Sequence, residues 1–97
     1  MYYILNYDYV ADIITKREPY RSEHLGILKT YQQADQLLLA GATGDPVAGA
    51  TFVFKVSGRD KVQEFVDSDP YVANGLVSQI SITPWTVVVG SAHQNET

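Results

Sequence analysis

The chain has 97 residues, a formal net charge of −4 at pH 7 and no cysteine. A chain of this length forms one domain and buries only roughly 60–65% of the surface that its unfolded form exposes, so its own core is thin. The absence of cysteine excludes disulfides, thiolate zinc sites and cysteine nucleophiles, and two histidines are too few for a histidine-rich metal cluster.

Charge and hydropathy also narrow the choice of partners. The seven basic residues are scattered, which argues against nucleic acid as a partner. No apolar run approaches the length of a membrane span, and the apolar N-terminus lacks a basic leader. We therefore expect a soluble cytoplasmic protein with neither a membrane nor a nucleic acid among its partners.

The first half of the chain predicts a strand, a helix and a second strand. Residues 2–8 are rich in β-branched and aromatic side chains, which favours a strand. Residues 10–19 predict an irregular connection with one helical turn, because Pro19 disfavours helix at the residue before it. The helix that follows presents one face made of Tyr20, His24, Ile27 and Tyr31. It ends in the polar residues Gln32, Gln33, Asp35 and Gln36. Residues 37–41 then form a short apolar strand.

The second half repeats this alternation of strands and helix. Residues 41–49 predict a loop, and the two-residue period of 50–56 predicts a third strand. Ser57 is placed to cap the next helix together with Asp60, three residues on. The buried stripe of that helix consists of Val62, Phe65 and Val66. Residues 76–84 alternate again and form a fourth strand.

The order strand, helix, strand, strand, helix, strand is the split βαβ arrangement of ferredoxin-like folds. We expect an α+β domain over residues 1–89, in which residues 85–89 extend the fourth strand. Its antiparallel sheet carries both helices on one face. Residues 90–97 are expected to form a flexible polar tail.

The other face of the predicted sheet stays uncovered. In the first strand, Tyr3, Leu5 and Tyr7 point to one side. Tyr2 and Ile4 point to the other side, so both faces carry apolar or aromatic side chains. A large apolar sheet surface rarely stays exposed in a soluble monomer. We therefore expect a homodimer that forms through the open face, closes a barrel-like core and is able to associate further.

His24 is the first candidate for catalysis, because it stands in an apolar helical stripe where a leucine would be expected. A buried histidine is more often satisfied by one structural hydrogen bond than it is a catalyst. The chain offers few competitors, however, since the only other histidine, His93, falls in the predicted tail. A general base that works near neutral pH is thus His24 or a strongly perturbed carboxylate.

Asp69 is the carboxylate best placed to partner that histidine. It precedes Pro70, which suits the first position of a short helix that ends at Asn74 and Gly75, so Asp69 is also a good N-cap. In the catalytic interpretation its carboxylate accepts from one imidazole nitrogen and leaves the other free to take a proton. Both roles are compatible, because a carboxylate has two oxygens.

Arg21, Tyr7 and Tyr71 are candidates for binding a substrate. Arg21 lies one turn before His24 and is able to orient an anionic or phenolic substrate, although a surface arginine has the same pattern. Arg17 is a weaker candidate of the same kind. Tyr7 and Tyr71 offer aromatic walls and hydroxyl donors, but most tyrosines in such positions serve packing. No metal cluster, dinucleotide fingerprint or Ser-His-Asp signature is present in the sequence, so we expect no metal and no organic cofactor.

Four segments together resemble the YciI-like proteins of the dimeric α+β barrel superfamily. They are Arg21-Ser-Glu-His24-Leu25, Leu37-Leu-Leu-Ala-Gly41, Phe65-Val-Asp-Ser-Asp69-Pro70-Tyr-Val-Ala-Asn-Gly75 and Ile82-Thr-Pro-Trp85. The resemblance implies a ferredoxin-like subunit, a dimer through the open sheet face, and a pocket that holds a His and Asp pair. It carries over to His24 and Asp69, with Arg21 as the matching arginine. The chain departs from the family at Asp35-Gln36, where a glycine-containing turn is usual.

The relatives that this resemblance implies include a dehydrochlorinase acting on a chlorinated hydroxyhydroquinone and, in the wider superfamily, muconolactone isomerase. Our first hypothesis is therefore a cofactor-free enzyme that uses His24 and Asp69 for proton transfer on a small cyclic or aromatic substrate, as a lyase or isomerase. The alternative is a dimeric module that binds or senses a small molecule without converting it. A third interpretation is an assembly domain in which His24 only packs.

Overall fold

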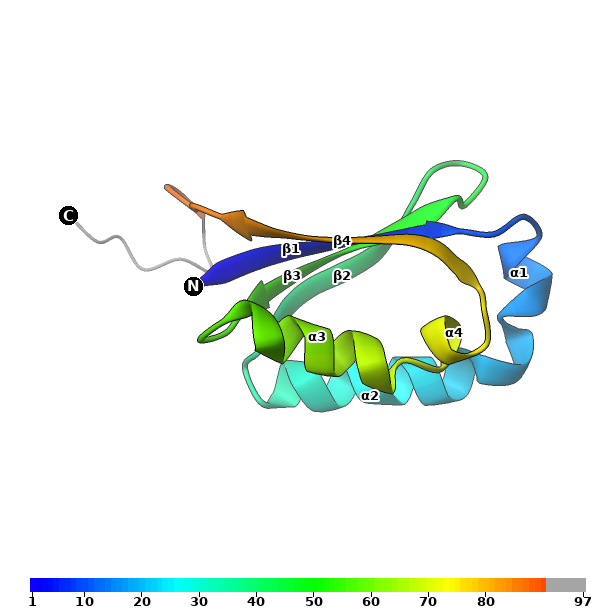
Figure 1. The fold of residues 1–97 in the computed structure, drawn as a ribbon, viewed down its shortest axis with the longest axis horizontal. Helices are drawn as coiled ribbons and strands as arrows, with labels where there is room; N and C mark the ends of the chain where they lie inside the picture. Colours follow the sequence, from blue (N-terminus) through cyan, green and yellow to red (C-terminus); the bar gives the residue numbers. More distant parts are fainter. Residues whose placement is uncertain (91–97) are drawn as a thin grey trace.

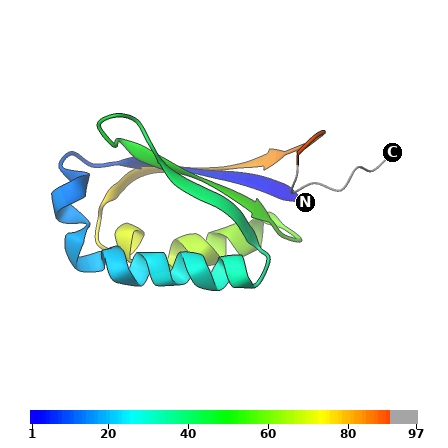
Figure 2. The same cartoon turned by 180° about the vertical axis from the view of Figure 1, so that it is seen from behind.

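The computed structural model describes residues 1–90 and consists of one antiparallel sheet with helices packed on one face (Figures 1 and 2). The strands are β1 (Tyr2–Tyr9), β2 (Leu37–Thr43), β3 (Gly49–Lys55) and β4 (Val77–Trp85). They pair in the order β2-β3-β1-β4, and every pair is antiparallel. This is the ferredoxin-like α+β topology that the sequence predicts.

Two longer and three shorter helical segments cover the sheet. The longer ones are α2 (Arg21–Gln33) and α3 (Arg59–Ser68), which lie side by side beneath the sheet in Figure 1. The shorter ones are α1 (Ile13–Lys16), the 3-10 turn η1 (Glu18–Tyr20) and α4 (Pro70–Ala73). In the described residues no helix is long and apolar enough to cross a membrane.

Several boundaries differ from the prediction for local reasons. Tyr20 closes η1 instead of opening α2, and β2 continues through residues 41–43, which were predicted as loop. The predicted cap by Ser57 is wrong, because the extended Gly58 is the residue that precedes α3 and no side chain caps it. In the fourth strand only Trp85 of the predicted extension 85–89 is included.

The turn after α2 contains Asp35, where the sequence departs from the YciI-like pattern that it otherwise resembles. That residue has a positive φ of 60°, a backbone conformation that glycine usually adopts. The amide of Gln36 donates to the carbonyl of Tyr31 at 3.0 Å and closes the helix end. Aspartate is among the residues that tolerate this conformation, so the turn forms without glycine.

The core lies between the helices and the inner face of the sheet. The inward side chains of β1 pair across the ladder with those of β3, so Leu5 lies opposite Phe52 and Tyr3 opposite Phe54. All four of these side chains are buried. Among the described residues, His24 and Asp69 are the buried polar or charged ones, which singles them out as residues that need a structural or chemical explanation.

Of the predicted tail 90–97, only Gly90 belongs to the described residues, and the domain boundary at residue 89 stays a prediction.

Candidate active site

His24 and Asp69 form a buried hydrogen-bonded pair. Nδ1 of His24 lies 2.8 Å from Oδ1 of Asp69, and the two residues are 5% and 1% exposed. The first turn of α2 carries the histidine, and the junction between α3 and α4 carries the aspartate. Pro70 favours an extended conformation at the residue before it, and Asp69 adopts one, with φ −78° and ψ 119°. The chain therefore leaves α3 at Asp69 and turns that carboxylate toward α2.

Asp69 accepts hydrogen bonds from three donors. Oδ1 accepts from the Tyr71 backbone amide at 3.0 Å in addition to His24, and Oδ2 accepts from the Tyr7 hydroxyl at 2.8 Å. Asp69 is thus the N-cap of α4 and the partner of His24 at once. Capping of α4 and pairing with His24 both use Oδ1, while Oδ2 is occupied by the Tyr7 hydroxyl.

These contacts assign a tautomer to the neutral imidazole of His24. An ionised carboxylate only accepts hydrogen bonds, so Nδ1 must carry the proton that it shares with Asp69. Nε2 is then the nitrogen with a free lone pair, able to take a proton from another molecule. This is the orientation that a histidine needs to act as a general base.

Two aromatic rings hold the His24 imidazole in place. The ring of Tyr71 stacks on it with 3.8 Å between centroids and 6° between planes. Phe52 meets it edge-on, with centroids 6.4 Å apart. With Asp69 fixing Nδ1, the imidazole has little freedom to rotate.

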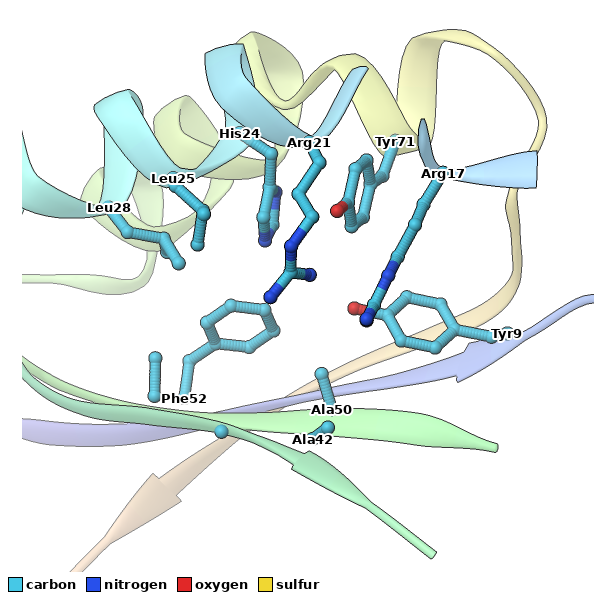
Figure 3. A pocket seen from close by; sticks show the side chains of 12 residues that line it. Tyr9, Arg17, Arg21, His24, Leu25, Leu28, Ala42, Ala50, Phe52 and Tyr71 are labelled. Carbon is cyan, nitrogen blue, oxygen red and sulfur yellow. The ribbon is translucent and has the colours of Figure 1, made fainter. Parts of the chain in front are cut away.

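A cavity of about 220 Å³ lies between the helices and the sheet, and His24 forms part of its wall. Figure 3 shows the side chains of His24, Arg21 and Tyr71 pointing into the same space above Phe52. A cavity of about 150 Å³ is enough to hold benzene, so this one has room for a substituted ring. The residues that line it are Tyr9, Arg17, Arg21, His24, Leu25, Leu28, Ala40, Gly41, Ala42, Ala50, Phe52 and Tyr71.

Three tyrosine hydroxyls at the site have a raised pKa. Burial raises the pKa of Tyr7, and the Asp69 charge raises it further. Burial also raises the pKa of Tyr9. The pKa of Tyr71 is raised by burial as well, although the Arg21 side chain, through its hydrogen-bonding group and its charge, and the charge of Arg17 act in the opposite direction. At neutral pH all three hydroxyls are therefore neutral and able to donate.

Two polar atoms at the site are buried without a hydrogen-bond partner among the described residues. They are Nε of Arg17 and the hydroxyl oxygen of Tyr71. A buried donor that stays unpaired costs about 1–3 kcal/mol. Both residues line the cavity, so a bound molecule is able to supply the missing partner.

The comparisons with known proteins place the chain in a family. The sequence model of the YCII-related domain matches residues 1–86. The chain belongs to the YCII-related family. Protein YciI of Escherichia coli O6:H1 is 31% identical over 97 residues, covering 91% of this chain and 99% of that protein. An uncharacterized protein of Haemophilus influenzae is 27% identical over the same coverage of both chains.

Two solved structures share the fold of this YCII-related chain. One is the 5-chloro-2-hydroxyhydroquinone dehydrochlorinase TftG from Burkholderia phenoliruptrix AC1100, in complex with 2,5-dihydroxybenzoquinone. It has a TM-score of 0.76 and 19% identity, covering 89% of this chain and 94% of that chain. The other, protein Atu4242 from Agrobacterium tumefaciens, has a TM-score of 0.54 and 16% identity, with 86% and 89% covered. At these identities the likeness shows the fold.

The structure of this YCII-related domain brings most of the predicted site residues together. His24, Arg21 and Tyr71 line the cavity. Asp69 is not part of the cavity wall and binds Nδ1 of His24. Tyr7 is not part of the cavity wall, since its hydroxyl is bound to Asp69. The roles of all five in catalysis or substrate binding stay predictions.

In the sequence analysis Arg17 was given little weight and Tyr9 was not named, although both residues line this wall. Arg17 precedes Arg21 by four residues, and this spacing was the available signal. It was weak, because Pro19 interrupts a helix between them and η1 joins α1 to α2 there. Among the described residues, no group of three His, Cys, Asp or Glu side chains is arranged to hold a metal ion.

Proposed function

We propose that the protein is a cofactor-free enzyme in which His24, held by Asp69, transfers a proton on a small cyclic or aromatic substrate. One observation carries this proposal: the buried carboxylate binds Nδ1 of a histidine whose ring lines a cavity of single-ring size. A histidine that only packed would need one hydrogen-bond partner and no cavity beside it. The wall of that cavity also offers donors, which a polar substrate requires.

The reaction class is an elimination or an isomerisation. Nε2 takes a proton from an acidic position of the ring, and Asp69 stabilises the imidazolium that forms. In an elimination the electrons of the broken C–H bond form a double bond, and chloride leaves with the electrons of the C–Cl bond. In an isomerisation the imidazolium returns the proton to another atom of the same substrate.

The size of the expected effect limits the choice of substrate. Positioned acid–base catalysis contributes roughly 10²–10⁴-fold, which is enough for a compound that already has an acidic proton. A hydroxyquinone or a lactone meets this condition. That a dehydrochlorinase of chlorinated hydroxyhydroquinone shares the fold is consistent with this class, but fold alone does not name the substrate.

We also propose that two copies of the chain associate through the outer face of the sheet. Large apolar side chains are exposed on that face, with Leu39 68% and Trp85 45% exposed. The ladder places both on the side opposite the core, because Trp85 pairs with Tyr2 and Leu39 with Val53. A second copy would bury these side chains and add to a thin core. Sedimentation that shows a folded monomer at micromolar concentration would contradict this part of the proposal.

The enzymatic proposal is tested with a panel of chlorinated hydroxyhydroquinones, hydroxyquinones and lactones. Wild type and His24→Gln are compared for turnover, and Tyr3→Phe serves as a control because Tyr3 is buried away from the cavity. We expect turnover of at least one compound by wild type and Tyr3→Phe, and a loss of at least about 100-fold in His24→Gln. Binding of panel compounds without any turnover would instead assign the protein to the class of small-molecule binding modules.

A further inference from the structure

One end of the cavity contains two positively charged side chains that form no ion pair with a carboxylate of the described residues. Arg17 and Arg21 both line this end, and neither forms an ion pair with a carboxylate within residues 1–90. Nε of Arg17 is buried and has no hydrogen-bond partner there. A guanidinium nitrogen that is removed from water normally has a hydrogen-bond acceptor, so Nε of Arg17 lacks a partner that a ligand could supply.

Two tyrosine hydroxyls lie in the field of both arginines. The charges of Arg17 and Arg21 each act on the hydroxyls of Tyr9 and Tyr71. The rings of these tyrosines also meet, with centroids 6.1 Å apart. Within residues 1–90 the hydroxyl of Tyr71, a residue only 1% exposed, is the second buried polar group without a hydrogen bond of good geometry, although the Arg21 side chain lies close enough to act on it. Figure 3 shows the four side chains converging on the side of the cavity away from Leu28.

The hydrogen-bonding character of these groups defines what binds here. A guanidinium has five N–H donors and no acceptor, and a neutral tyrosine hydroxyl donates one hydrogen bond and also accepts. The other groups that line the cavity are mostly apolar, apart from His24. A ligand that pairs with these donors must therefore bring an acceptor, and two guanidinium groups without a direct ion pair favour an acceptor that is negatively charged.

We propose that Arg17 and Tyr71, with Arg21 beside them, bind the anionic oxygen of a single-ring ligand, either a carboxylate or a phenolate. Arg17 is thereby a residue that determines specificity for anionic over neutral rings. As a statement about the substrate, this inference rests on the proposed function, because the same cavity holds the reacting ring. The anionic group would lie at the arginine end, and the acidic position of the ring would face His24. Negative charge that develops on the oxygen during proton removal would be stabilised by the same cations.

The test measures binding, so that it does not depend on turnover. Benzoate and nitrophenolate serve as the anionic probes, and benzamide is the neutral probe of the same shape as benzoate. Affinity is measured by calorimetry, and the site is located by shifts of backbone amide resonances. The variants are Arg17→Gln and Tyr71→Phe, which keeps the ring that stacks on His24. Lys16→Gln is the matched control, because it removes one positive charge from the neighbouring, exposed residue, which does not line the cavity.

We expect at least one anionic probe to bind wild type and Lys16→Gln equally, and about tenfold or more tighter than benzamide. Arg17→Gln is expected to weaken that probe by about tenfold or more, and Tyr71→Phe to weaken it to a smaller extent. Preference for benzoate identifies a carboxylate site, and preference for nitrophenolate a phenolate site. Equal binding of anionic and neutral probes, no saturable binding of either anion, or an Arg17→Gln variant that binds like wild type would overturn the inference.

Two outcomes separate this inference from the proposed function. Anion-selective binding in a protein that converts no compound of the panel would sustain the inference and contradict the enzymatic proposal. Turnover of neutral rings at a rate that Arg17→Gln does not change would sustain the enzymatic proposal and contradict the inference about the anionic ligand.

Discussion

The hydroxyl of Tyr7 donates to Oδ2 of Asp69 at 2.8 Å, from a position 62 residues earlier in the chain. This bond occupies the carboxylate oxygen that neither His24 nor the Tyr71 amide uses. A residue on the central strand β1 thus helps to orient a base on α2 through a carboxylate that follows α3. The geometry of the proposed base is therefore tied to the core of the domain.

Replacing Tyr7 by phenylalanine tests this connection. The variant leaves one oxygen of a buried carboxylate without its donor, so we expect the free energy of unfolding to fall by about 1–3 kcal/mol. The measurement is urea unfolding. Tyr3→Phe is the matched control, because the Tyr3 hydroxyl donates to the Met1 sulfur, a weak acceptor, at 3.7 Å, and the change in stability should stay within about 0.5 kcal/mol. Equal losses in the two variants would show that the bond to Asp69 contributes nothing specific.

Asp69 is expected to tolerate asparagine far better than alanine. The asparagine oxygen accepts from the Tyr71 amide as a cap does, and its amino group donates to the hydroxyl oxygen of Tyr7. We expect Asp69→Asn to lose no more than about 1 kcal/mol of stability, whereas Asp69→Ala leaves three donors unpaired and loses several times as much. The measurement is thermal unfolding of the two variants under the same conditions. Similar losses of stability in Asp69→Asn and Asp69→Ala would contradict the prediction.

The raised tyrosine pKa values predict that the free energy of unfolding falls at alkaline pH. Tyr7, Tyr9 and Tyr71 each have a pKa raised by burial in the folded state, while in the unfolded chain a tyrosine ionises near pH 10. The neutral form is favoured by folding, so these residues contribute their full stability below about pH 10 and lose it as the pH rises further. Tyrosinate absorbance and circular dichroism should show part of the tyrosines ionising only when the fold is lost. Ionisation of every tyrosine in a protein that keeps its native circular dichroism would contradict the prediction.

Two glycines are expected to respond in opposite ways to alanine. At Gly26, in the interior of α2, a Cβ atom meets nothing within 4 Å, so Gly26→Ala should stabilise the protein by about 1 kcal/mol through helix propensity. At Gly49, a Cβ atom would collide with the backbone carbonyl oxygen of Tyr7, so Gly49→Ala should destabilise the protein and disturb β1. Chemical denaturation of both variants measures this difference. A Gly49→Ala variant as stable as wild type would mean that the approach of β3 to β1 is looser than the structure has it.

The sequence was informative wherever a local pattern determined the structure. Helical spacing placed His24 on the buried face of α2, and the Asp69-Pro70 step marked a capped helix start. Both signals depend on neighbours in the chain. Alternation in β1 likewise predicted that Tyr7 points inward.

The sequence failed where the outcome depends on distant contacts. No local pattern indicates that the Tyr7 hydroxyl binds Asp69 and so is not part of the cavity wall, since this requires the packing of β1 against the α3–α4 junction. Arg17 reaches the cavity only because α1 and η1 turn the chain back toward Tyr9 and Tyr71. Ser57 fits a capping pattern, but the chain starts α3 one residue later, after an extended Gly58.

The most direct test of the central claim is incorporation of solvent deuterium into a ring substrate, followed by NMR. Proton removal by His24 leads to exchange at the acidic ring position even where no net product forms, so wild type in deuterated buffer should accelerate exchange in a hydroxyquinone or a lactone. His24→Gln should lose at least about 100-fold of that rate, Asp69→Asn a part of it, and Tyr3→Phe none. Exchange at the same rate in wild type and in His24→Gln would contradict the claim that this histidine moves the proton.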